Sequence, residues 1–132
     1  MDIIDDIREL LATKYPDLPY TVTNHTIRVI SPAPEGFNVS LQDPGREFIV
    51  GYGNGWHEHF TSQDEAFNCF AFGFSANCRL KITRRGRCAY KWTVEALEDG
   101  KWIEDSTTGT VPMMFWRPRR VEYRRNALSQ GG

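Results

Sequence analysis

Apolar residues recur with the period of an α-helix in two short stretches of this chain, and almost everywhere else they alternate with polar residues as in β-strands. This pattern restricts the fold to a few classes. A helix is predicted over residues 2–15, where it ends before Pro16 and its apolar face consists of Ile3, Ile4, Ile7, Leu10 and Leu11. A second helix is predicted over residues 62–75, where Ser62-Gln63-Asp64-Glu65 matches a capping box. Its apolar face consists of Ala66, Phe67, Phe70, Ala71 and Phe74.

The other segments alternate between apolar and polar residues, as strands do when one face of a sheet is buried. Strands are expected at residues 26–31, 37–41, 48–52, 79–85, 87–97, about 102–103, 110–116 and 119–125. Turns at Asp43-Pro44-Gly45 and Glu98-Asp99-Gly100 join neighbouring strands into hairpins. The predicted fold is α+β, with two helices packed on one face of a mostly antiparallel, twisted sheet of six to seven strands, in the order α-βββ-α-βββ(β).

The length and composition are those of one globular domain. With 132 residues, of which 40% are hydrophobic and 25% charged, the chain can bury a single core. We expect the domain to span residues 1–128 and a flexible tail to occupy 129–132. No apolar run is long enough to cross a membrane, and the acidic start of the chain lacks the basic region of a secretory signal. Three cysteines (Cys69, Cys78 and Cys88) cannot complete a disulfide framework, so a cytoplasmic protein is predicted.

Charge is unevenly distributed along the chain. Up to residue 66, four Lys and Arg stand against eleven Asp and Glu, a net charge of −7. From residue 67 onward, twelve basic residues stand against six acidic ones, a net charge of +6. This asymmetry indicates an anionic partner, unless the two halves fold against each other and neutralise one another. The pI of about 6.3 argues against a dedicated nucleic-acid binder.

The segment Trp56-His57-Glu58-His59-Phe60 carries the candidate metal ligands. If it is extended, His57 and His59 project to the same side and can both bind a divalent metal through imidazole nitrogens, while Glu58 faces the other way. A third ligand would have to come from His25 or a cysteine. The simpler interpretation is a pair of half-exposed histidines on a strand or loop, held between two aromatic residues of the core.

The same segment supports a second hypothesis, a small-molecule site built around Tyr52, Trp56 and the two histidines. It follows the glycine-rich stretch 51–55, which lacks the spacing of known phosphate-binding loops. We therefore interpret these glycines as a tight or flexible turn.

Basic residues cluster near the end of the chain, with aromatic residues among them: Arg117, Arg119, Arg120, Tyr123, Arg124 and Arg125. Such a segment has three interpretations. The arginines can protect an exposed edge strand against aggregation. They can belong to a protein interface, where Trp, Tyr and Arg contribute most of the binding energy. They can also bind single-stranded nucleic acid through phosphate contacts and stacking.

The chain contains more large aromatic residues than one core needs. Phe72 falls on the polar side of its predicted helix, and Trp116 follows Phe115, so the two cannot face the same core from one strand. Surplus aromatics are typical of a partner surface, although a second layer of the chain could cover them. We predict that Phe72, Trp116, Arg120 and Tyr123 contact a partner.

No catalytic signature accompanies the cysteines or histidines, and the chain lacks a GxSxG motif. The favoured function is therefore a small, soluble, non-enzymatic module that binds another protein or a second copy of itself. The order of its elements is similar to that of small bacterial chaperones and immunity proteins, a likeness of topology that no particular residues carry. The metal or small-molecule site and nucleic-acid binding are the alternatives.

Overall fold

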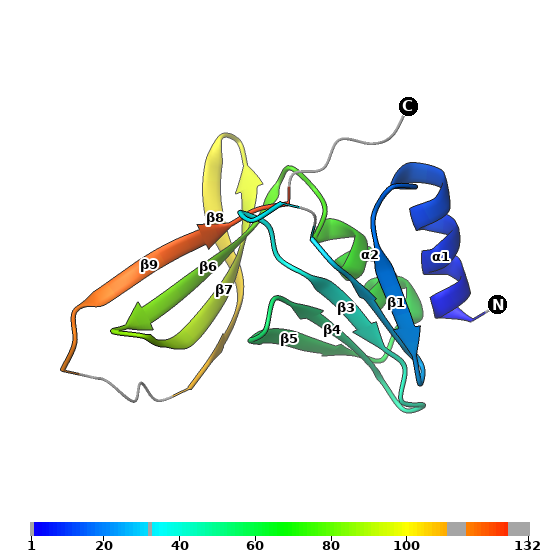
Figure 1. Cartoon of the computed structure of the whole chain (residues 1–132), viewed down its shortest axis with the longest axis horizontal. Coiled ribbons are helices and arrows are strands. Elements are labelled where there is room, and N and C mark those ends of the chain that lie inside the picture. Colours follow the sequence, from blue (N-terminus) through cyan, green and yellow to red (C-terminus); the bar gives the residue numbers. More distant parts are fainter. Residues whose placement is uncertain (1, 32, 111–115, 127–132) are drawn as a thin grey trace.

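The computed structural model describes residues 2–31, 33–110 and 116–126, and these form two helices and nine strands (Figure 1). In chain order they are α1 (Ile3–Lys14), β1 (Tyr20–Thr23), β2 (Thr26–Val29), β3 (Val39–Gln42), β4 (Phe48–Tyr52), β5 (Trp56–Phe60), α2 (Gln63–Phe72), β6 (Cys78–Arg85), β7 (Cys88–Glu98), β8 (Lys101–Gly109) and β9 (Arg119–Arg124). The α+β class and the antiparallel pairing are confirmed. The expected tail at 129–132 and most of the expected strand at 110–116 lie outside the described residues.

The strands are divided between two antiparallel sheets, which corrects the prediction of one six- to seven-stranded sheet. The first sheet has the order β1-β2-β3-β4-β5 and the second has the order β8-β7-β6-β9. The division occurs at α2, because the chain leaves the first sheet after β5, packs α2 against β3, β4 and β5, and only then begins β6. β5 and β8 are joined by hydrogen bonds between the sheets, in which the Thr108 hydroxyl donates to the carbonyl of His57 at 3.3 Å and the Ser106 hydroxyl donates to the Glu58 carboxylate at 3.2 Å.

The strands expected from the sequence include neither β1 nor β5, since residues 56–60 are interpreted there as a strand or a loop. β1 pairs with β2 from Tyr20↔Val29 to Thr23↔Thr26. The turn between them contains Asn24 and His25, both with positive φ (41° and 63°). Such turns ordinarily contain glycine, so this hairpin lacks the usual sequence signal.

Both helices begin as the sequence predicted. The Asp2 side chain accepts a hydrogen bond from the backbone N–H of Ile4, and the Ser62 hydroxyl accepts one from the N–H of Glu65. The apolar faces of the two helices pack on the same face of the first sheet (Ile3, Ile4, Ile7 and Leu11 of α1, Ala66 and Phe70 of α2). Within the described part of the chain, no helix has the length and hydropathy needed to cross a membrane.

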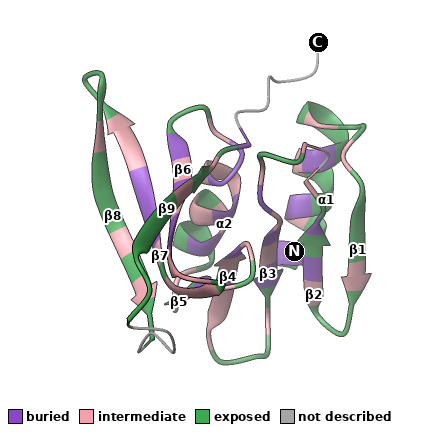
Figure 2. Ribbon diagram, turned by 60° about the vertical axis from the view of Figure 1, so that its left-hand side comes forward, coloured by how far each residue is buried: buried purple, intermediate pink, exposed green. Residues whose placement is uncertain are grey.

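Among the described residues, the part of the second sheet that is buried in this core belongs to β6 and β7. Cys78, Leu80, Ile82 and Val94 are buried in the same cluster as the helices and the first sheet. Beyond this contact the second sheet extends away from the helices, to the left in Figure 1. Figure 2 shows the consequence. The residues of β8 and β9 are exposed or intermediate, whereas the helices and strands that contain buried residues are α1, α2 and β2 to β7.

The glycine-rich stretch 51–55 is a tight turn shaped by packing. Gly53 has a positive φ of 64°, which side-chain-bearing residues rarely adopt. A Cβ atom on Gly55 would lie only 2.0 Å from the Trp92 ring. Trp92 therefore packs directly on the backbone of this turn and holds the second sheet against the first.

We expect Gly55→Ala to lower the free energy of unfolding by about 2 kcal/mol, because the Trp92 ring must move to admit the new methyl group. Gly109→Ala is the matched control, since a Cβ there makes an ordinary contact at 3.4 Å. Urea denaturation of both variants measures the difference. Equal stability of the two variants would show that Trp92 does not fix the turn.

Candidate functional site

The acidic and basic residues that are separated along the sequence also lie in different parts of the fold. The acidic residues up to position 66 lie on the helices, on the first sheet and in the loops that connect them, and all twelve basic residues of the later half lie between Arg79 and Arg125. Among the described residues, each ion pair joins two residues of the same half (His59–Glu47, Arg79–Glu95, Arg84–Glu122 and Arg124–Glu122). The halves are therefore not neutralised by ion pairs between them, and many basic side chains of the later half are exposed (Arg87, Lys91, Lys101, Arg117, Arg119, Arg120 and Arg125).

β9 is one of the two edge strands of the second sheet, which carries these basic residues and is called the basic sheet below, and β8 is the other. β9 pairs with β6 along its full length, from Arg85↔Arg119 to Leu80↔Arg124. In the described residues it has no strand on its other side, which we call the outer edge of β9. Val121 and Tyr123 alternate along it with 39% and 49% of their surface exposed. The strand therefore combines backbone able to pair with another strand, basic side chains and exposed apolar surface.

Tyr123 is held in place by an arginine that sequence reasoning did not single out. The Arg79 guanidinium carbon lies 4.1 Å from the centroid of the Tyr123 ring and 4.3 Å from that of Trp102. Its Nε donates to the carboxylate of Glu95 at 2.5 Å, and Glu95 is only 6% exposed. This stack connects all four strands of the second sheet, and its only sequence signal is alternation, which places Arg79 and Glu95 opposite each other.

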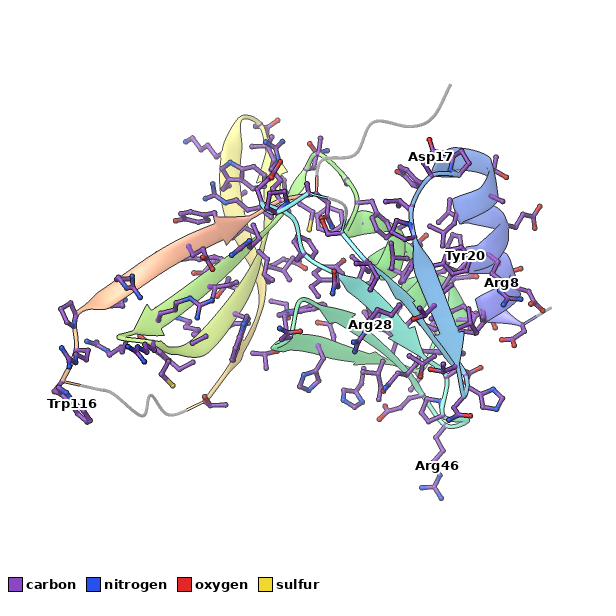
Figure 3. The ribbon with its side chains drawn as sticks, viewed as in Figure 1. Arg8, Asp17, Tyr20, Arg28, Arg46 and Trp116 are labelled. Carbon is purple, nitrogen blue, oxygen red and sulfur yellow. The ribbon has the colours of Figure 1, made fainter. Side chains whose placement is uncertain are left out.

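The four predicted partner residues do not form one surface. Trp116 is 64% exposed and lies just before β9, at the end of the molecule remote from the helices (Figure 3). Arg120 is exposed, and its guanidinium donates to the carbonyl of Gly86 at 2.7 Å. Tyr123 lies near the far end of the strand, so these three residues are distributed along β9 and the segment just before it. Phe72 is separate from them, because it is half-buried on α2 and packs against the core.

The two predicted metal ligands lie side by side on β5. The rings of His57 and His59 are exposed, with centroids 5.6 Å apart, and Nδ1 of His59 lies 2.9 Å from the Glu47 carboxylate. His25 lies in the β1–β2 turn, at the opposite edge of the sheet. Within the described ranges, no three His, Cys, Asp or Glu side chains are grouped as a metal ion requires. Metal binding by the pair stays a prediction.

Tyr52 and Trp56, predicted to contact a small molecule, are core residues instead. They are 0% and 2% exposed, and their rings stack with centroids 4.5 Å apart. The Tyr52 hydroxyl donates to the backbone carbonyl of Cys69. Strand alternation explains this placement, because it turns both rings toward the helices. A ligand approaching from solvent does not reach them in this structure.

Cys69, which is half-buried, and Cys78, which is buried, are unsuited to nucleophilic chemistry. Burial raises the pKa of the Cys69 and Cys78 thiols to about 12, so both are protonated at neutral pH. A thiol needs its deprotonated form to attack a substrate. Both residues therefore act as small apolar side chains.

Comparisons of the sequence with protein-family models and curated proteins, and of the fold with solved structures, find no match. The charge, exposure and contacts of the second sheet are thus the observations from which a function can be inferred.

Proposed function

We propose that this protein is a non-enzymatic binding module that takes an extended, acidic segment of another protein onto the outer edge of β9. The observation that carries the proposal is the position of β9, an edge strand with exposed Val121 and Tyr123 in the half of the chain whose net charge is +6. The three free cysteines support a reducing, cytoplasmic location for this activity.

The binding mode follows from the chemistry of a strand edge. An incoming strand forms main-chain hydrogen bonds with the outer edge of β9, and alternate side chains then determine which sequences fit. Residues 119, 121 and 123 share one face of β9 because successive strand residues point to opposite sides, and Arg125 follows the end of the strand. Val121 and Tyr123 offer apolar contacts on that face, and Arg119 and Arg125 attract acidic side chains at its two ends.

The same charges argue against a second copy of this chain and against a nucleic acid as the molecule bound at β9. Two copies of β9 would bring like charges together, which disfavours a homodimer formed by pairing β9 with itself. A nucleic acid would be attracted by the second sheet but repelled by the acidic half, whose net charge is −7. A short acidic peptide segment contacts the basic sheet alone.

The test measures fluorescence anisotropy with a labelled decapeptide in which Glu alternates with Val, at low salt. We expect saturable binding to the protein and about tenfold weaker binding to Arg119→Glu, because the substitution places like charges beside the peptide. Arg8→Glu is the matched control, since Arg8 is an exposed residue of α1, far from β9 (Figure 3). This control should bind as the wild type does.

Two results would contradict the proposal. Equal affinity of the wild type and Arg119→Glu would place the peptide elsewhere, and absence of binding at low salt would exclude this class of partner. Labelled oligothymidylate, titrated in parallel, tests the alternative. If the oligonucleotide binds more tightly than the peptide and loses affinity in Arg119→Glu, the basic sheet is a nucleic-acid surface.

A further inference from the structure

A cleft of about 370 Å³ lies between the two sheets where they diverge, and it is separate from the outer edge of β9. This volume is within the range of about 300–1,000 Å³ that is typical of small-molecule sites. The cleft is lined by loop residues of the first sheet and by the inward faces of β6, β7 and β9: Gly36, Phe37, Asn38, Gly53, Asn54, Leu80, Ile82, Arg84, Ala89, Trp92, Glu122 and Arg124.

One part of the cleft is apolar and rigid. Phe37 and Leu80 are buried, and Ile82 is 8% exposed. The Trp92 ring is fixed against Gly55, as described above, so the surface exists before any ligand arrives. Aromatic walls of this kind favour a flat ring, because offset and edge-on ring contacts add to the gain from apolar burial.

The other part of the cleft carries an ion-pair network with a net charge of +1. Glu122 accepts hydrogen bonds from the guanidinium groups of Arg84 and Arg124, each at 3.2 Å. Partial burial alone would raise the pKa of Glu122, but the two arginines outweigh that effect and hold the pKa below its usual value. Glu122 is therefore ionised at neutral pH, and the network keeps one positive charge in excess.

The arginines retain hydrogen-bonding capacity beyond this network. A guanidinium has five N–H donors in a planar fork. In the described residues, Arg84 donates one of them, to Glu122, and Arg124 donates to Glu122 and to the carbonyl of Pro34. Glu122 thus orients both groups while leaving donors for a second carboxylate.

We propose that this cleft binds a small organic anion consisting of an aromatic ring and one carboxylate. The ring lies against Phe37 and Trp92, and the carboxylate accepts hydrogen bonds from Arg84 and Arg124. A monoanion matches the single excess charge, whereas a phosphate dianion would also meet the carboxylate of Glu122. The site uses the inward side chains of β9, so it does not depend on partner binding at the outer edge.

The experiment compares phenylacetate with phenylacetamide, which has nearly the same shape but no charge. Isothermal titration calorimetry measures affinity, and the indole N–H signal of Trp92, assigned with Trp92→Phe, reports the position of the ring. We expect phenylacetate to shift this signal and to bind about tenfold more tightly than the amide, because hydrogen bonds between charged groups are the stronger ones.

The matched variants are Arg84→Gln and Arg87→Gln, which remove the same charge inside and outside the cleft. Arg87 is exposed in the turn between β6 and β7 and does not line the cleft. Arg84→Gln should bind phenylacetate no better than the wild type binds the amide, and Arg87→Gln should bind as the wild type does.

Equal affinity for the acid and the amide in the wild type would overturn the proposal, and this comparison does not require any variant to fold. Absence of binding by phenylacetate, or binding without a shift of the Trp92 signal, would overturn it as well. Peptide binding at β9 is measured separately, so either result leaves that test intact.

Discussion

Replacing Arg79 by methionine is expected to lower the free energy of unfolding by about 3 kcal/mol, because it leaves a buried carboxylate without its partner. The side chains of Arg79 and Glu95 are 22% and 8% exposed, and the bond between them measures 2.5 Å. Methionine keeps the long apolar stem between Trp102 and Tyr123 but removes the charge. Urea denaturation followed by circular dichroism measures the loss.

A double variant separates the lost ion pair from lost packing. Arg79→Met combined with Glu95→Leu replaces both charges by apolar groups, which is often neutral for buried pairs, so most of the stability should return. Lys91→Met is the control, because Lys91 is exposed on the neighbouring strand and has no ion pair among the described residues. If Arg79→Met cost no more than Lys91→Met, the stack around Tyr123 would not stabilise the sheet.

The elements that sequence predicted well are those whose signals are local. The N-terminal cap of α2 at Ser62 and the turn at Asp99-Gly100 depend on residues within a few positions, and both occur where expected. β1 escaped prediction for the same reason, because its turn uses Asn24 and His25 at positive φ where a glycine would have been recognised. A turn or cap can be predicted from the sequence only when it contains the residue types that are typical of it.

The division into two sheets depends on contacts that no local pattern contains. β9 pairs with β6 although β7 and β8 lie between them in the sequence. The pairing of β7 with β6 shifts register beside Thr83, and its pairing with β8 shifts register beside Val94. Such shifts bend and twist strands, so a continuous alternation in the sequence does not reveal them. Gly55 is a similar case, since its role is apparent only once Trp92 is placed against it.

The candidate site was predictable in part for related reasons. Trp116 and Tyr123 are exposed, as expected for aromatics beyond the needs of one core, whereas Phe72, chosen on the same argument, packs against the core. Helical periodicity assigns one buried face to α2, but a helix in contact with several elements can bury more than one. Tyr52 and Trp56 are predicted from the sequence to contact a small molecule together with the two histidines of β5, yet alternation along β4 and β5 turns the two aromatic rings inward.

Asn126 is the polar residue that ties the end of the described chain to the core. It is 9% exposed. Its Oδ1 accepts from the backbone N–H of Phe37 at 2.9 Å and from the hydroxyl of Ser31 at 3.2 Å. Its Nδ2 donates to the carbonyls of Phe37 and Gly73, both at 3.0 Å. The side chain thus links the residues after β9 to the loop before β3 and to the end of α2.

Asn126→Asp is expected to lower the free energy of unfolding by about 3 kcal/mol at neutral pH, because it places a buried carboxylate against two carbonyl oxygens. In that surrounding the folded state favours the protonated acid, so its pKa rises above the unfolded value of about 3.9. The folded variant then binds more protons than the unfolded one between those two pKa values. The destabilisation relative to the wild type should therefore shrink as the pH falls from neutrality toward 4. Asn24→Asp makes the same change at an exposed turn. It should neither lower the free energy of unfolding by a comparable amount nor make it depend on pH in this way. A loss at position 126 that stayed constant with pH would mean that the Asn126 amide is not donating to these carbonyls.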